Sequence, residues 1–281
     1  NSTTLLGIDY ENLGTDAVVH LEGQGGEDRL IALGTDGSDV FGVAGTSTIT
    51  LNEQLDLTTA NVESSTLQGL GGDDTFNITP FSVPISIEGD EPGSGSDVLN
   101  VTAAGNVTVD LGEATVEDDV ATASPDVSYS GIERINVVAG SNNLTVVGSD
   151  SDDTLAVQPT GTMADAVEVR LAGHPLVAGS GIGTFTVDGD DGNDTIEVSG
   201  NEANNTADIS TSLVDFTSLL DVNLTNAEAL SVDGQQGDDT FNVTSGDIPI
   251  AIVGGDPIGS TSSGDSLNVI AGSEDASYFP G

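Results

Sequence analysis

The chain has 281 residues and a formal net charge of -44, with 47 Asp and Glu residues against three arginines and no lysine. This balance excludes nucleic acids and anionic membrane surfaces as partners, because both are bound through clusters of Lys and Arg. The absence of cysteine excludes disulfide bonds and thiolate metal sites, and no apolar run approaches the ~18 residues of a membrane span.

The excess of acidic residues also has a consequence for folding. Self-repulsion at this charge destabilises a compact state unless cations neutralise it, so the composition indicates bound divalent ions, a high-salt habitat, or both. Hydrophobic residues make up 36% of the chain, and their short β-branched runs supply a buried face that argues against disorder. The chain starts at Asn1 without an initiator Met or a signal peptide, so we expect a mature or excised segment.

Short runs that alternate apolar and polar residues recur along the whole chain. Each predicts a half-buried β-strand, because successive side chains of a strand point to opposite faces. Glycines typical of turns separate the runs at intervals of about 20 residues, and no stretch shows the i, i+3, i+4, i+7 spacing of an amphipathic helix. The clearest runs are 49–51, 76–78, 85–87, 107–111, 135–137, 144–146, 167–171, 248–252 and 267–269.

One turn motif, Gly-x-x-Gly-x-Asp followed by an alternating run, precedes several of these strands. Its best example is Gly189-Asp-Asp-Gly-Asn-Asp194-Thr-Ile. Glycine adopts positive φ without steric strain, so such a turn can aim backbone carbonyls at one point. The aspartates of the six copies are Asp28, Asp39, Asp74, Asp153, Asp194 and Asp239, and Ser151 replaces the second glycine in the Asp153 copy.

A longer repeat contains these turns. Residues 73–79 match residues 238–244, an offset of 165 (238 minus 73), and the match extends from Leu55 and Leu220 to Pro92 and Pro257. We therefore predict two tandem β-repeat units, 1–165 and 166–281, the second shorter than the first and continuous with it. Because the second unit lacks a counterpart of 117–165, we expect the chain to come from a longer array.

Strands and turns at this spacing favour an all-β fold, a parallel β-solenoid of the β-helix or β-roll kind, in which equivalent positions stack from rung to rung. About a dozen rungs at ~4.8 Å each predict a rod of roughly 55–60 Å. A pair of tandem β-sandwich domains is the alternative that the same pattern allows.

A second signature places a glutamate after an apolar residue, just ahead of an alternating run. It occurs at Glu63, Glu133 and Glu228. One interpretation is a solvated glutamate at the entry of a strand. The other is a glutamate that reaches a cation at the neighbouring turn.

The acidic turns have the composition of calcium sites, because calcium takes six to eight oxygens from carboxylates and backbone carbonyls. The alternative for each aspartate is a turn-stabilising side chain that bonds its own backbone. Asp97 and Asp265, in related turns, are weaker candidates. The predicted calcium ligands are Asp28, Asp39, Asp73, Asp74, Asp153, Asp190, Asp194, Asp238 and Asp239.

The turn motif resembles the nonapeptide of the RTX family of calcium-binding repeats, Gly-Gly-x-Gly-x-Asp-x-apolar-x, from which residues 189–197 depart only at the second position. The resemblance implies a parallel β-roll with calcium between stacked turns, in a secreted or cell-surface protein. By this resemblance the six motif aspartates match the family's ligand aspartate. RTX nonapeptides follow one another directly, whereas the copies here are separated by longer segments, as in repetitive surface and adhesin-like β-solenoids.

Catalysis has little support, and we predict that the chain is not an enzyme. Three scattered arginines cannot provide the basic groups that a lyase acting on acidic sugars uses, and a chain without tryptophan offers no aromatic sugar platform. Asn-x-Thr sequons are frequent, and they either carry glycans in a secreted protein or form ladders of stacked asparagine. Examples begin at Asn77, Asn106, Asn143, Asn223 and Asn242.

Together these features predict a structural extracellular repeat protein, a calcium-stabilised segment of a cell-surface layer, adhesin or extracellular fibre. Its expected partners are further copies of itself or neighbouring repeats of a longer chain, and surface glycans. The alternatives are a β-helical glycosidase or lyase, or the accessory domain of one. A further alternative is a halophile's surface protein whose acidity serves solubility in salt without specific calcium sites.

Overall fold

The structure is a computed structural model that describes residues 18–44, 48–52, 55–79, 83–90, 96–120, 126–160, 165–255 and 264–270. In these residues the chain forms 26 β-strands and no helix, which confirms the predicted all-β class. None of them therefore forms a helix that could cross a membrane.

The strands form two open sheets of 13 strands each. In spatial order, sheet A consists of β1 (Val18–Glu22), β5 (Leu55–Ala60), β4 (Thr48–Leu51), β3 (Val40–Ala44), β7 (Thr75–Ile78), β9 (Val98–Thr102), β13 (Arg134–Val138), β17 (Leu176–Ser180), β16 (Val167–Arg170), β15 (Thr154–Pro159), β19 (Thr195–Ser199), β23 (Ala229–Asp233) and β25 (Ile250–Val253). Sheet B consists of β2 (Arg29–Leu33), β6 (Ser64–Gln68), β8 (Ile85–Glu88), β12 (Val127–Ser130), β11 (Thr115–Asp118), β10 (Val107–Asp110), β14 (Leu144–Val147), β18 (Phe185–Asp188), β22 (Val222–Thr225), β21 (Leu213–Phe216), β20 (Thr206–Ile209), β24 (Thr240–Thr244) and β26 (Ser266–Ile270).

The chain winds back and forth between the two sheets, so most neighbouring strands are parallel. Strand β6 in sheet B leads to β7 in sheet A, then to β8 beside β6 and to β9 beside β7. Equivalent residues stack across this path, as where Asn77 pairs with Asn100 and Asn100 with Asn136. Parallel pairing of strands from successive passes of the chain is therefore present in both sheets.

Four antiparallel meanders interrupt this winding, which a uniformly parallel coil would lack. They are β3–β5 and β15–β17 in sheet A, and β10–β12 and β20–β22 in sheet B. In each, three consecutive strands lie side by side in one sheet before the chain crosses over, so the middle strand runs against its neighbours. Asn52, directly after β4, and Ala114, between β10 and β11, adopt positive φ (53° and 54°).

A continuous apolar core lies between the two sheets, because alternate residues of nearly every strand point inward. Five phenylalanines are at most 1% exposed, namely Phe41, Phe76, Phe185, Phe216 and Phe241. The rings of Phe41 and Phe76 stack with centroids 5.0 Å apart. The outward positions carry mostly Thr, Ser, Asn and acidic residues, so the alternation seen in the sequence separates core from surface.

The sequence duplication crosses between the sheets. Residues 73–79 contain β7 of sheet A, whereas their match, 238–244, contains β24 of sheet B. The same exchange relates β8 to β25 and β9 to β26. For β9 and β26 the offset is 168 (265 minus 97), because the second unit carries three extra residues before Asp265. Matched segments of the two units therefore lie in opposite layers of the molecule.

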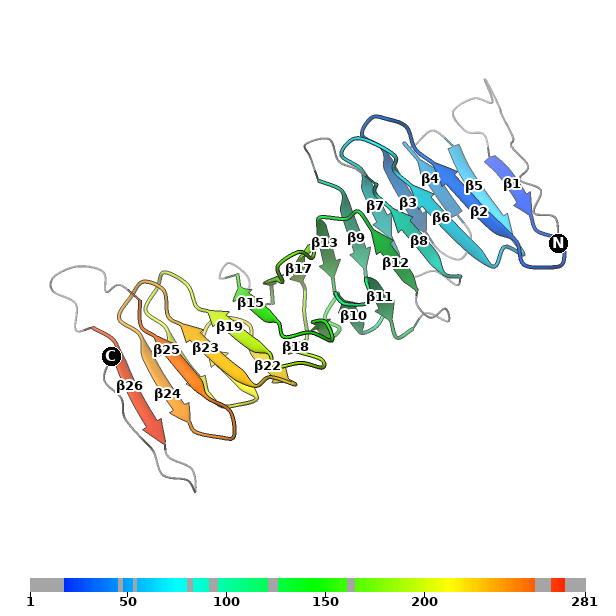
Figure 1. Cartoon of the computed structure of the whole chain (residues 1–281). Coiled ribbons are helices and arrows are strands. Elements are labelled where there is room, and N and C mark those ends of the chain that lie inside the picture. The colour runs from blue at the N-terminus through cyan, green and yellow to red at the C-terminus, as the bar shows by residue number, and fades with distance from the viewer. Residues whose placement is uncertain are drawn as a thin grey trace.

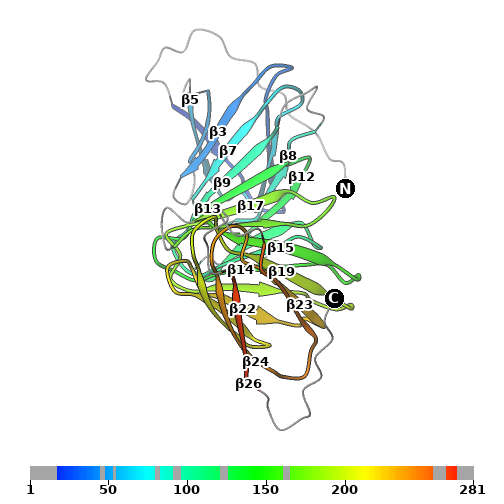
Figure 2. The same cartoon turned by 90° about the vertical axis from the view of Figure 1, so that its left-hand side faces the viewer.

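The two sheets form an elongated, twisted body with the described ends of the chain far apart (Figure 1). Strands β1 and β2 lie at one end, and β25 and β26 lie at the other. The strand direction turns progressively along the body (Figure 2), as the intrinsic twist of β-strands requires.

The continuity of the core predicts a graded response to truncation of its side chains. Phe185 is 0% exposed between Leu144 and Val222, so Phe185→Ala is expected to destabilise the fold by about 3–5 kcal/mol in urea unfolding followed by circular dichroism. Leu267 is 53% exposed on the last strand, and Leu267→Ala is expected to lower stability by less than about 1.5 kcal/mol. Equal losses would contradict a core that is closed in the middle and open at its end.

Candidate functional site

The motif aspartates form rows that run across neighbouring strands, at the point where each strand begins. In the first row Asp39, Asp74 and Asp97 immediately precede β3, β7 and β9, and Glu133 precedes β13. The backbone N–H of each aspartate donates to a carboxylate oxygen of the next residue in the row, ending at Glu133, with all three distances 2.7 Å. Such a row is termed a carboxylate ladder below.

Three further carboxylate ladders have the same geometry. Along β15, β19 and β23, the N–H groups of Asp153 and Asp194 donate to the carboxylates of Asp194 (2.8 Å) and Glu228 (2.7 Å). Along β20, β24 and β26, the N–H groups of Asn205 and Asp239 donate to Asp239 (2.7 Å) and Asp265 (2.9 Å). Between β2 and β6, the N–H of Asp28 donates to Glu63 (2.7 Å).

Each step of a ladder ties the backbone twice. The carbonyl of Asp39 accepts from the N–H of Thr75, and the carbonyl of Asp74 accepts from that of Val98, both at 2.9 Å. The turn residue thus has partners for its N–H and its C=O at the point where the strand begins. A hydrogen bond to a charged group contributes about 1.5–3 kcal/mol, so the ladders act as locks between rungs.

The three signature glutamates occupy ladder positions. Their partners can be compared with the two interpretations of the signature, a solvated glutamate at a strand entry or one that reaches a cation at the neighbouring turn. Glu63, Glu133 and Glu228 do reach the neighbouring turn, but each accepts from a backbone N–H there at 2.7 Å. The longer side chain of glutamate therefore substitutes for an aspartate at the last rung of three ladders.

The first glycine of the motif is required because the aspartate folds back over it. An ideal Cβ on Gly69 would lie 2.0 Å from Oδ2 of Asp74, and one on Gly234 would lie 2.3 Å from Oδ2 of Asp239. On Gly189 it would lie 2.1 Å from the carbonyl oxygen of Asn226 in the next rung. The side chain and the neighbouring backbone together fill the space that any other residue would need.

In four of the six copies, the second glycine of the motif is required for a different reason. Gly26, Gly72, Gly192 and Gly237 have φ of 137°, 116°, 142° and 144°, values that L-residues rarely adopt. In the turn before Asp153 the equivalent residue is Ser151, whose φ is not positive. This explains why that copy of the motif tolerates serine.

The residue after the first glycine divides the turns into two kinds. In one kind, the N–H of Gln24 or Ser149 donates to Oδ2 of Asp28 (3.2 Å) or Asp153 (2.7 Å). In the other, this residue has positive φ, and the buried Oδ2 of the ladder aspartate has no hydrogen-bond partner among the described residues. The second kind comprises Leu70 with Asp74, Asp90 with Asp97, Asp190 with Asp194, and Gln235 with Asp239.

The carboxyls with an unpartnered oxygen have raised pKa values. Burial, followed by neighbouring carboxylates, raises the pKa of Asp74, Asp194 and Asp239. Burial also raises the pKa of Asp97 to about 6, against an ordinary value of 3.8. The bond from the backbone N–H opposes these shifts without cancelling them. The ladders therefore combine strong acceptors with carboxyls that bind protons more readily than exposed ones.

The predicted calcium ligands separate into buried and surface groups. Asp39, Asp74, Asp194 and Asp239 are at most 2% exposed, and Asp28 and Asp153 are half-buried in ladders. Asp73 is exposed, whereas Asp190 and Asp238 are half-buried outside the ladders. Burial raises the pKa of Asp190, and the neighbouring Asp150 and Asp110 raise it further.

One oxygen of each accepting ladder carboxylate bonds a backbone N–H, and in four ladder aspartates the other oxygen is buried without a partner among the described residues. The described residues also contain no group of three or more acidic or histidine side chains placed to hold a metal ion. Calcium binding at these turns stays a prediction.

Other ladder members carry weaker signals in the sequence. Asp97 and Asp265, the two weaker candidates, hold full ladder positions. Asn205 was not predicted, although its N–H donates to Asp239. Residues 200–205 have the spacing of the motif with Ala203 in place of the second glycine, so a motif that allowed both Ala and Asn would have found Asn205. Outside the four ladders, Asp126 makes a similar contact, because it accepts from the N–H of Asp118 at 2.6 Å, and it was not predicted either. Asp126 follows no glycine turn.

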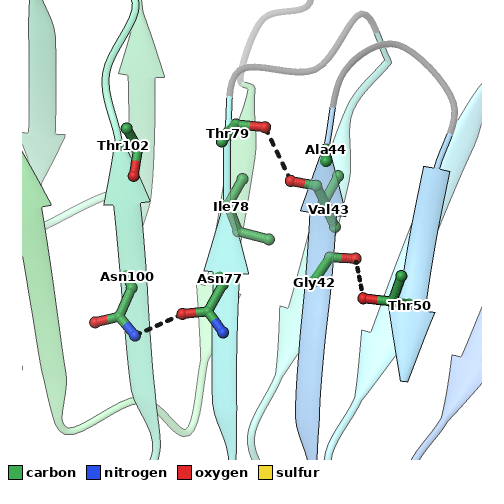
Figure 3. A pocket seen from close by; sticks show the side chains of 9 residues that line it. All are labelled: Gly42, Val43, Ala44, Thr50, Asn77, Ile78, Thr79, Asn100 and Thr102. Carbon is green, nitrogen blue, oxygen red and sulfur yellow. Dashed lines mark hydrogen bonds between the residues drawn. The ribbon is translucent and has the colours of Figure 1, made fainter. Parts of the chain in front are cut away.

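The outer face of sheet A carries a ladder of asparagines. Asn100 donates to Asn77 at 2.9 Å, and Asn136 donates to Asn100 at 2.8 Å. Beside it lies a hollow of about 250 Å³ over Gly42, lined among others by Thr50, Asn77 and Thr102 (Figure 3). The residues that line this hollow include no titratable side chain. Asn77 thus follows the stacked-asparagine interpretation of its sequon.

Comparisons of the chain with models of protein families, with curated proteins and with solved structures found no significant match.

The first glycine of the motif offers a matched pair of substitutions. Gly69→Ala places a Cβ against Asp74 and is expected to destabilise the fold by about 1–3 kcal/mol or more in urea unfolding. Gly25→Ala, where a Cβ meets nothing within 4 Å, is expected to be neutral or slightly stabilising. Equal effects of the two substitutions would contradict the packing of the ladder aspartate on its glycine.

The pKa of Asp97 predicts how stability depends on pH. The pKa of Asp97 in the folded chain, about 6, lies above its ordinary value of 3.8. The contribution of this group to stability is therefore complete below pH 3.8 and is lost as the pH rises through about 6. Asp97→Asn keeps the acceptor without the charge. It is expected to raise the melting temperature relative to the parent chain at pH 7, with a smaller gain below pH 4.

The exposed neighbour Asp73 provides the control for this measurement. Asp73→Asn removes one charge from the adjoining turn, that of Asp74, without removing a ladder residue. A loss of stability for Asp97→Asn at neutral pH, with none for Asp73→Asn, would show that the ladder needs the ionised carboxylate.

Proposed function

We propose that this chain is a structural segment of an extracellular or cell-surface assembly, such as a surface layer, an adhesin or an extracellular fibre. Its role is to provide a stiff, twisted rod, and the rod belongs to the β-solenoid type with four antiparallel meanders built into its rungs. The observation that carries this proposal is the use of the acidic side chains. They stand at the turns and lock rung to rung.

The placement of carboxylates supports this function over a glycoside-cleaving enzyme. A glycosidase needs two carboxyl groups that face each other across a substrate groove. The nearest arrangement is Asp215, whose pKa is raised by burial and then by Asp221, which precedes β22, and by Asp208 on β20. These three lie on the outward side of sheet B, where the register places Asp208 opposite Asp215. The hollow over Gly42 lies on the other sheet.

Calcium remains a second candidate contributor to stability, favoured by the acidic surroundings of Asp190. Asp150, Asp110, Asp191 and Asp188 all act on Asp190, and a divalent cation near them would relieve their repulsion. Monovalent salt would relieve the same repulsion by screening. The two sources of stability therefore differ in whether calcium acts at constant ionic strength.

Thermal unfolding by far-UV circular dichroism, in millimolar calcium and then in EGTA at fixed ionic strength, tests this distinction. A rod locked by backbone-to-carboxylate bonds is expected to melt at nearly the same temperature in both, and to become more stable with added sodium chloride. A large loss of β signal in EGTA would show that calcium, and not the carboxylate ladders, is the main source of stability. A chain without a cooperative β transition in either condition would overturn the structural proposal.

A further inference from the structure

The rod has two unpaired ends of different character. At the first end β1 and β2 are the outermost strands of sheets A and B, and at the second end β25 and β26 are (Figure 1). No strand of the described chain pairs with their outer edges. An unpaired edge presents a row of N–H and C=O groups that can accept another strand.

Exposed large apolar side chains gather on these terminal strands. Of the ten in the described chain, six lie there: Ile31, Leu33, Val253, Leu267, Val269 and Ile270. Under the sequence duplication, Leu267 and Val269 match Leu99 and Val101. The inner pair is 0% and 5% exposed because β13 lies beside β9, whereas Leu267 and Val269 are 53% and 55% exposed. The end of the rod therefore has the side chains of an interior rung.

The carboxylate ladders leave complementary polar groups at the two ends. In the interior, the N–H of Asp97 donates to Glu133 on the next rung. Its match Asp265 ends a ladder, and its N–H has no acceptor among the described residues. Asp28 starts a ladder, and its Oδ1 has no donor there. Both residues precede strands of sheet B, so one end offers a donor and the other an acceptor.

We propose that a second copy of this chain docks head to tail, with β26 of one copy beside β2 of the next in a continued sheet B. The two strands are parallel to each other within sheet B, because each meander reverses the direction twice. The ladder sets the register: Asp265 opposite Asp28 places Ser266 opposite Arg29, Leu267 opposite Leu30 and Val269 opposite Ala32. Strand β25 then meets β1 in sheet A.

This register matches the chemistry of both faces of the sheet. Leu30 and Ala32 are partly buried against the core, so Leu267 and Val269 would continue that core across the junction. On the outer face, Ile270 would meet Leu33, two side chains that are 60% and 53% exposed in the single chain. Arg29, one of the three cations, would lie beside Asp265.

The contact joins unlike surfaces, so it repeats without closing and produces filaments. The net charge of -44 opposes it, and high salt should permit it because the screening length falls to about 3 Å at 1 M. The proposal rests on the structural role proposed above and names the partner of that rod.

Sedimentation velocity over a range of concentrations in about 1 M sodium chloride tests whether the copies associate. Val269→Lys is expected to weaken association about tenfold or more, since lysine on an edge strand opposes pairing. Val120→Lys is the matched control, because Val120 is 61% exposed and lies away from the ends. Each substitution also lowers the negative charge, so electrostatics alone would favour association in both variants.

Cysteine cross-linking tests the register. The chain has no cysteine, and the proposed register places Asn268 opposite Ile31 on the outer face. Disulfide-linked dimers are expected when Asn268→Cys and Ile31→Cys chains are mixed, and neither variant should link to itself. Self-linking of either variant would show a like-to-like contact and overturn the proposal.

A chain that stays monomeric at all concentrations, or associates equally as Val269→Lys, would also overturn it. The circular dichroism melt of the same samples separates this result from a failure of the structural role. A folded rod that does not associate would contradict only the docking proposal. An unfolded chain would contradict both the docking and the structural role.

Discussion

The fold depends on one constraint: a carboxylate placed inside a turn must find a donor, and this chain has almost no cations to supply one. The donor is the backbone N–H at the start of the adjoining strand. Burying a charge without such a partner is strongly unfavourable. Each rung is therefore positioned by its neighbour, and a slip of one residue would separate every carboxylate in a ladder from its N–H at once.

The glycines follow from the same constraint. The first glycine makes room for the folded-back carboxylate, and the second lets the turn reach a φ near 140° in three of the turns. Where the residue after the first glycine also has a positive φ, its N–H does not bond the ladder aspartate. One oxygen of that carboxylate then has no partner. The turn motif is thus a compromise between a tight backbone path and full hydrogen bonding. The raised pKa values of Asp74, Asp194 and Asp239 record what the compromise leaves unsatisfied.

Much of this architecture was predictable from alternation and glycine spacing. The runs at 107–111 and 167–171 became β10 and β16 almost to the residue. The meanders were not, because a half-buried strand alternates in the same way beside parallel or antiparallel neighbours, as the run at 49–51 illustrates in β4. Local spacing also singled out Asp74 and Asp194. Their partners could not be found locally, since Asp39 and Asp74 are 35 residues apart in the chain.

The exchange of sheets between the two sequence units affects what such a rod shows to its surroundings. Asn77 faces outward from sheet A, and its match Asn242 faces outward from sheet B. A long array built from these units would carry the same surface pattern alternately on its two sides, before the twist spreads it around the axis. Charge and polar rows would balance across the rod. Neither side of the rod would differ from the other in its surface pattern. Lateral contacts in a bundle of such rods would therefore not favour one side.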